Sequence, residues 1–153
     1  MPNDDNNDII CGAGAGGGPH VISFDAESLD ILTSTFAFDP SFTGGVFVSS
    51  SGGVNGSAVN VICSMGAGST PQVALFEGVQ TTPFQTFLAY DAGFPGGVRT
   101  AVVPSPTLDS FRLMTGPGLG GGPQVKLFDP LSEEVVDSFF AFDPDFLGGL
   151  FVC

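Results

Sequence analysis

The chain has 153 residues, and 42% of them are apolar, which is too hydrophobic for a disordered glycine-rich linker despite 23 glycines. Its net charge of −13, with only Arg99, Arg112 and Lys126 positive, would repel phosphate backbones and argues against nucleic-acid binding. No apolar run approaches the roughly 20 residues of a membrane helix. Residues 1–5 lack the basic and apolar regions of a signal peptide, so neither membrane insertion nor a signal peptide is expected in this chain.

The sequence repeats with a period of 52 residues. Four sets of positions keep this spacing without a slip: Pro19, Pro71 and Pro123; Asp39, Asp91 and Asp143; Phe42, Phe94 and Phe146; and the pairs Gly44-Gly45, Gly96-Gly97 and Gly148-Gly149. Chance does not produce such a pattern, and a fixed period of this length indicates a repeat architecture. We therefore expect three whole units, at about residues 1–49, 53–101 and 105–153.

In chain order, the first unit predicts four short strands. Apolar and β-branched residues occupy 8–13, 20–25, 31–38 and 46–49, and the later units repeat them. A glycine-rich turn follows the first strand, and a polar turn follows the second. Residues 39–45 (Asp-Pro-Ser-Phe-Thr-Gly-Gly) predict a tight hairpin before the fourth strand.

The predicted fold class is all-β, with three four-stranded antiparallel blades of the β-propeller type. Four strands in about 50 residues match one propeller blade. Strands one to three carry apolar residues at adjacent positions, which is typical of a sheet covered on both faces. A twelve-stranded β-sandwich would explain the strands but not the strict period.

Three blades do not close a propeller, which typically needs about four to eight. We therefore expect other chains to complete it. Either two copies close a six-bladed ring with twofold symmetry, or a head-to-tail contact grows into a filament. A third alternative is that the blades of a longer protein cover both ends. Because each unit runs from strand one to strand four, the sequence predicts contacts between whole blades, without a strand exchanged between them.

The motif Gly-Ala-Gly-Ala-Gly-Gly-Gly-Pro-His-Val, followed by Phe-Asp and by Phe-Ala-Phe-Asp-Pro-Ser-Phe-Thr-Gly-Gly-Val, resembles the FG-GAP/VCBS-like repeats of bacterial surface proteins. The resemblance implies a β-propeller at the cell surface or outside the cell, used for adhesion or scaffolding. It also implies a calcium loop before the first strand of a unit, where Asp4 and Asp8 match the family's ligand positions. The corresponding loop of the second unit has lost every carboxylate, and in that of the third unit Arg112 replaces the last aspartate, so we expect the fold to need no metal.

The remaining candidate residues have structural interpretations. Asp39, Asp91 and Asp143 are expected to accept backbone N–H groups in turns. His20, with Gln72 and Gln124 at the equivalent positions, is expected at the start of a strand. Cys11 and Cys63 share one position of the repeat and predict buried free thiols. Asn55 begins a glycosylation sequon, Asn-Gly-Ser, in a loop.

The chain shows no catalytic motif, no zinc or redox cysteine pattern, and no glycine-rich loop that opens a helix. We therefore expect a protein that is not an enzyme. The favoured function is a structural or adhesive module that assembles with itself. The alternative is a carbohydrate-binding propeller with glycan pockets between its blades, although a lectin should repeat exposed aromatic residues and the chain has no tryptophan.

Overall fold

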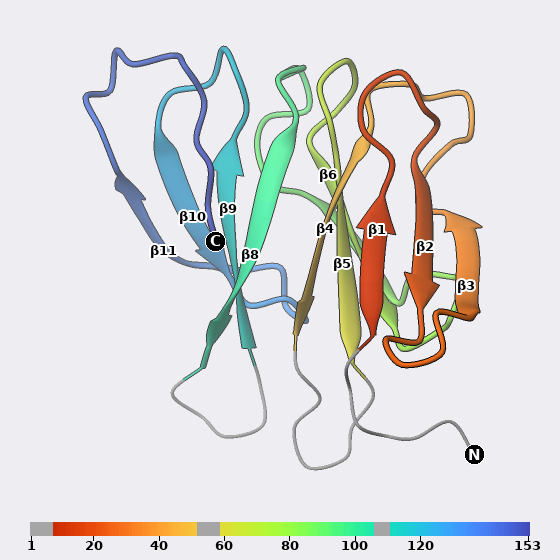
Figure 1. The fold of residues 1–153 in the computed structure, drawn as a ribbon. Coiled ribbons are helices and arrows are strands. Elements are labelled where there is room, and N and C mark those ends of the chain that lie inside the picture. The colour runs from red at the N-terminus through yellow and green to blue at the C-terminus, as the bar shows by residue number, and fades with distance from the viewer. Residues whose placement is uncertain (1–7, 52–58, 106–110) are drawn as a thin grey trace.

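The structure is a computed structural model that describes residues 8–51, 59–105 and 111–153. These residues form eleven strands and no helix, which confirms the all-β prediction. In chain order (Figure 1) the strands are β1 (Ile9–Gly12), β2 (His20–Phe24), β3 (Ile31–Phe36), β4 (Val46–Ser51), β5 (Asn60–Met65), β6 (Gln72–Glu77), β7 (Gln85–Leu88), β8 (Val98–Pro104), β9 (Phe111–Pro117), β10 (Gln124–Phe128) and β11 (Val135–Phe140).

The strands form three antiparallel sheets whose boundaries differ from those of the repeat. The first sheet holds only β1, β2 and β3, whereas the second runs β4-β5-β6-β7 and the third runs β8-β9-β10-β11. Thus β4, which is the fourth strand of unit one, pairs with the first strand of unit two, with Val46 opposite Met65. In the same way β8 pairs with β9, with Val98 opposite Pro117.

This topology corrects two expectations from the sequence. The four strands of one unit do not share a sheet, and residues 39–45 do not form a hairpin, because β3 and β4 lie in different sheets. The segment instead carries the chain from the outer edge of one sheet to the inner edge of the next. The period could not reveal this exchange, because moving the sheet boundary by one strand leaves a spacing of 52 residues unchanged.

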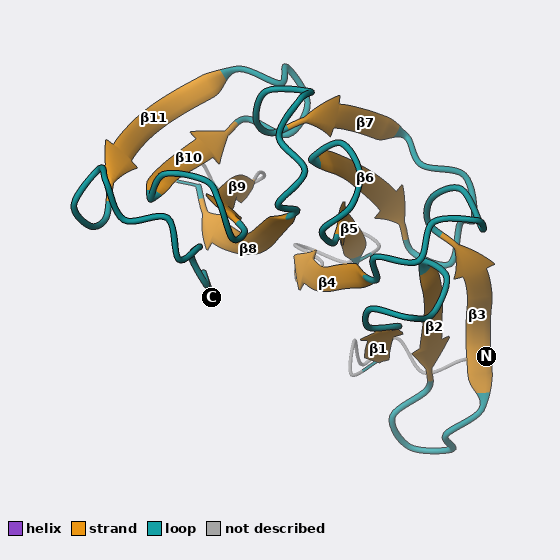
Figure 2. Cartoon of the chain, turned by 90° about the horizontal axis from the view of Figure 1, so that it is seen from above, coloured by secondary structure: helices purple, strands orange, loops and turns teal. Residues whose placement is uncertain are grey.

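Seen from above, the three sheets lie side by side around an arc (Figure 2). Strands β1, β4 and β8 and the C-terminal end lie on the inner side of the arc, and β3, β7 and β11 lie on the outer side. The described residues form no closed barrel.

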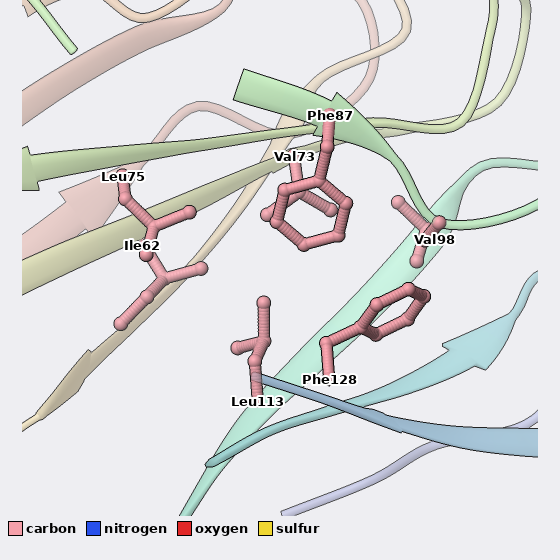
Figure 3. Close-up of a cluster of buried hydrophobic side chains, with 8 residues drawn as sticks. Ile62, Val73, Leu75, Phe87, Val98, Leu113 and Phe128 are labelled. Carbon is pink, nitrogen blue, oxygen red and sulfur yellow. The ribbon is translucent and has the colours of Figure 1, made fainter. Parts of the chain in front are cut away.

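Two apolar cores hold the sheets together. The core between the second and third sheets is shown in Figure 3. The second sheet contributes Ile62, Val73, Leu75 and Phe87, the third sheet contributes Val98, Leu113 and Phe128, and Ala89 completes the cluster. Between the first and second sheets, the buried residues are Val21, Val46, Cys63, Ala74 and Phe76.

The second sheet is therefore covered on both faces. Cys63 belongs to one core, and its neighbour Ile62 belongs to the other. Because successive side chains of a strand point to opposite faces, this explains why the sequence has apolar residues at adjacent positions.

Glycines allow the crossing segments to approach the neighbouring sheet. A Cβ added to Gly66 would lie 2.0 Å from the carbonyl oxygen of Gly44, and one added to Gly118 would lie 1.8 Å from that of Gly96. Gly45 and Gly97 also have positive φ, at 83° and 79°. These positions need glycine because no other residue leaves room for the backbone contact.

We expect Gly66→Ala to destabilise the fold by about 3 kcal/mol or more, because the new methyl group would overlap a backbone oxygen that cannot move aside cheaply. Gly122→Ala is the matched control, since a Cβ there would come no closer than 3.5 Å to any atom. Urea unfolding followed by circular dichroism measures both variants. Equal stability of the two would show that the close contact at Gly66 does not constrain the fold.

Candidate assembly surface

The inner side of the arc holds an arginine between two phenylalanines. Phe47, Arg99 and Phe151 occupy equivalent positions of the three units. The guanidinium carbon of Arg99 lies 4.0 Å from the ring centre of Phe151 and 5.4 Å from that of Phe47. Nη1 of Arg99 also donates a hydrogen bond of 2.7 Å to the carbonyl oxygen of Leu150. These contacts attach the C-terminal segment to β8.

The C-terminal segment, residues 150–153, begins where an inner strand should begin. The backbone N–H of Leu150 donates to the carbonyl of Pro117 at 2.9 Å, just as Val46 donates to Ala13 at 2.8 Å. Leu150 is only 4% exposed, but the next residue, Phe151, is 85% exposed. The sequence predicts a fourth strand here, and the structure shows none. A strand needs a neighbouring strand to pair with, and none formed by the described residues pairs with this segment.

The first sheet, in contrast, has a strand, β1, that lacks an inner partner. Within the described chain, β1 pairs with β2 on one side and with no strand on the other. The N–H groups of Gly66 and Gly118 each donate a 2.9 Å hydrogen bond to the inner strand's chain, at Gly45 and Gly97. No such bond is formed by Gly14, which is the equivalent residue of unit one, and a Cβ added there would meet no atom within 4 Å. Among the described residues, the inner edge of the first sheet is therefore open.

Both ends of the arc also present apolar faces. Phe87 is 7% exposed in the core between the second and third sheets, whereas its repeat equivalent Phe139, in the third sheet, is 49% exposed. Cys63 is buried, whereas its equivalent Cys11 is exposed.

The structure therefore corrects the prediction that Cys11 is buried, because no sheet formed by the described residues covers its face. All three cysteines are free. Burial raises the pKa of the Cys63 thiol to about 12.

The three repeated aspartates lie in equivalent turns. A carboxylate oxygen of Asp39 accepts the N–H of Ser41 at 2.8 Å. Asp91 and Asp143 accept N–H groups two residues further on, at 2.8 and 2.9 Å. The Ser41 hydroxyl, followed by its backbone N–H, lowers the pKa of Asp39.

The other predicted residues take no part in a common site. His20 begins β2 and contacts the hydroxyl of Ser34 at 2.8 Å, as Gln124 contacts Ser138. Asp8 is exposed, and the described residues contain no group of three or more His, Cys, Asp or Glu side chains that could hold a metal ion. Asp4 and Asn55 lie outside the described residues, so the predicted calcium ligand and glycosylation site stay predictions.

A hollow of about 310 Å³ lies between the second and third sheets, and it is the clearest candidate for a glycan pocket. Its lining includes Glu77, Phe84, Phe111 and Asp129. The Asp129 carboxylate already accepts the N–H groups of Leu131 and Ser132, and these bonds lower its pKa. Both bonds go to the same carboxylate oxygen, Oδ1.

Sequence reasoning missed Arg99, the open edge of β1 and the role of the C-terminal segment. One signal was present. A cation stands at position 99, where the other units have phenylalanine, and cation–π contact is a known preference of arginine.

Comparisons of the chain with protein-family models, with curated proteins and with solved structures gave no match. The resemblance to FG-GAP/VCBS-like repeats therefore stays a prediction. In the part of the chain that the structure describes, no helix is long and apolar enough to cross a membrane.

We expect Arg99→Ala to release residues 150–153 from β8 and to cost about 2 kcal/mol of stability, from one charge-assisted hydrogen bond and two ring contacts. Hydrogen exchange measured by mass spectrometry should show faster exchange in the C-terminal peptide. Arg112→Ala is the control for the loss of one positive charge. Unchanged exchange in the C-terminal peptide of Arg99→Ala would mean that other contacts hold the segment.

We expect the stabilising effect of Asp39 to disappear in acid. Because its folded pKa is lowered below the unfolded value of about 3.9, the carboxylate stabilises the fold above that pH, and the effect is lost as pH falls through the folded pKa. Asp39→Ala should lower Tm by a few degrees at pH 7, and the gap to the unsubstituted chain should close as the pH falls through the folded pKa. Asp8→Ala controls for the removed charge, and a gap that persists in acid would contradict the assignment.

Proposed function

We propose that this protein is a non-catalytic structural module that assembles with itself, end to end, through contacts of the same kind as those between its own sheets. The observation that carries the proposal is the difference between equivalent residues at the ends and in the middle of the arc. Positions that are buried at the two internal junctions, such as Phe87 and Cys63, are exposed at the ends as Phe139 and Cys11.

The energetics support this proposal. Covering an end face would bury several hundred Å² of mostly apolar surface, and such patches are larger than monomers usually expose. At about 25 cal/mol per Å², the gain is on the order of 10 kcal/mol per face before the cost of association. Because the units derive from one repeat, the third sheet carries at its end Val125 and Phe139, the equivalents of Val73 and Phe87, which the second sheet packs against the third.

The resulting assembly is either a ring or a filament. A contact between the third sheet of one copy and the first sheet of the next is heterologous, so it closes only if the rotation per copy allows it. Two copies would close a six-bladed propeller, and a rotation that does not close would give an extracellular filament. A surface location and an adhesive role are the setting that the sequence resemblance implies for either form.

We expect the chain to sediment as a dimer or a larger species at micromolar concentration in analytical ultracentrifugation. Each copy carries a net charge of −13, so assembly should strengthen as NaCl rises from about 20 mM to 500 mM and screens the repulsion. Phe139→Asp is the disrupting variant, and Phe84→Asp, an exposed residue away from the end faces, is its control. A folded monomer under all of these conditions would refute the proposal.

A further inference from the structure

We propose that residues 149–153 of one copy add to the open edge of β1 in a second copy and become the missing inner strand of its first sheet. This inference rests on the proposed self-assembly and specifies its contact. It replaces a general packing of apolar faces with a defined backbone pairing. The two partners are a C-terminal segment without a neighbouring strand and a first strand without an inner neighbour.

The two internal examples fix the register of this pairing. In the second sheet, Val48 lies opposite Cys63, and the third sheet repeats that register 52 residues later, with Thr100 opposite Thr115. Continued by one more unit, the register places Val152 opposite Cys11 of the second copy. Leu150 then lies opposite Ala13, and Phe151 lies opposite Gly12.

The glycines of both partners fit the same register. The pair Gly44-Gly45 contacts Gly66 and its neighbour Ala67, and the pair Gly96-Gly97 contacts Gly118 and Leu119. By the same register Gly148-Gly149 would contact Gly14 and Ala15 of the second copy. Gly14 has open space where its two equivalents have the carbonyl oxygens of Gly44 and Gly96 within 2.0 Å. Its φ is not positive, so nothing in the described part of a single chain requires a glycine at this position.

A hollow marks the place that the second copy would fill. It is lined mainly by Phe142, Phe146 and Gly148, together with the C-terminal segment. At the internal junctions this space is occupied. The carbonyl oxygen of Ala67 would lie 2.1 Å from a Cβ on Gly44, and that of Leu119 would lie 2.4 Å from one on Gly96. At Gly148 the three atoms nearest to an added Cβ all belong to Phe146, at 2.4 to 3.2 Å.

The occupant is a second copy because the two partners lie at opposite ends of the arc. The C-terminal segment is held on the third sheet by Arg99 and Pro117. The first sheet, which carries β1, lies beyond the intervening second sheet (Figure 2). Residues 149–153 and residues 10–15 contain no charged side chain, whereas Asp143 lines the hollow beside the C-terminal segment.

A disulfide trap tests the register. Next to the β4–β5 ladder, the N–H of Gly66 donates to the carbonyl oxygen of Gly45, so these two residues form a hydrogen-bonded pair. Bonded and non-bonded positions alternate, so Val48 and Cys63 form a non-hydrogen-bonded pair. The Cα atoms of such a pair lie about 4.5 Å apart, within the range that a disulfide spans. Val152→Cys in a Cys153→Ser background should therefore form a disulfide with Cys11 of another copy under mild oxidation. Phe151→Cys in the same background is the matched control, because its side chain points to the other face of the sheet.

Non-reducing electrophoresis and peptide mass spectrometry distinguish the outcomes. A bond between chains, from Cys11 to the cysteine introduced at position 152, with little product from the position-151 control, supports the inference. An assembly that forms without this bond, or equally with both variants, overturns the strand addition and leaves the proposed self-assembly intact. A bond within one chain overturns the second copy as occupant. A chain that stays monomeric and forms no bond overturns both proposals.

Gly14→Ala provides a second, independent measurement. Its methyl group meets no atom in the single chain, so circular dichroism and the unfolding of the diluted chain should not change. In the proposed contact the methyl group would overlap the backbone of the second copy, and we expect the dissociation constant to rise on the order of tenfold or more. Assembly of Gly14→Ala with unchanged affinity would contradict the inference.

Discussion

The backbone pairing between the fourth strand of one unit and the first strand of the next is the contact on which the rest of the structure depends. It joins β4 to β5 and β8 to β9, so that the second and third sheets each contain chain from two units. The crossing segments therefore hold adjacent sheets at a fixed separation, and the apolar side chains of both sheets fill the space between them. In an isolated unit the first strand would lack the fourth strand of the preceding unit. The unit's own fourth strand would have no strand to pair with.

This pairing restricts the residue type strictly at a few positions and only weakly at others. Gly66 and Gly118 have no room for a side chain, because the inner strand's chain passes directly over them. The core positions accept different side chains, since one junction contains Tyr90, Lys126 and Thr115 where the other contains Phe38, Ala74 and Cys63. There the Lys126 ammonium lies 4.7 Å from the ring centre of Tyr90, and a polar group is accommodated without a change in backbone register.

Sequence reasoning predicted the strands well and the sheets poorly. The alternation of glycine and proline turns with β-branched segments is local, so most strands were correctly placed from residues that lie within them. The partner of β4 depends on contacts between residues 9 to 19 positions apart, and the periodicity is the same for either partner. Gly14 and Gly66 are the same residue at equivalent positions of the repeat, so the sequence does not distinguish them. They differ only in the atoms that surround them in the folded chain. Arg99 was the exception, since a cation in a column of phenylalanines is visible in the sequence itself.

Residue-resolved hydrogen exchange at low and high chain concentration shows whether residues 149–153 of one copy pair with β1 of another. Ala13 donates to His20, so alternate residues of β1, Ile9 and Cys11, also direct their N–H groups toward β2. The N–H groups of Ile10, Gly12 and Gly14 point to the open edge. If residues 149–153 add to β1, the N–H groups of Ile10, Gly12 and Gly14 exchange rapidly in the dilute chain and become protected on assembly. Those of Ile9 and Cys11 are protected in both states. Assembly that leaves Ile10, Gly12 and Gly14 in rapid exchange would contradict this strand addition.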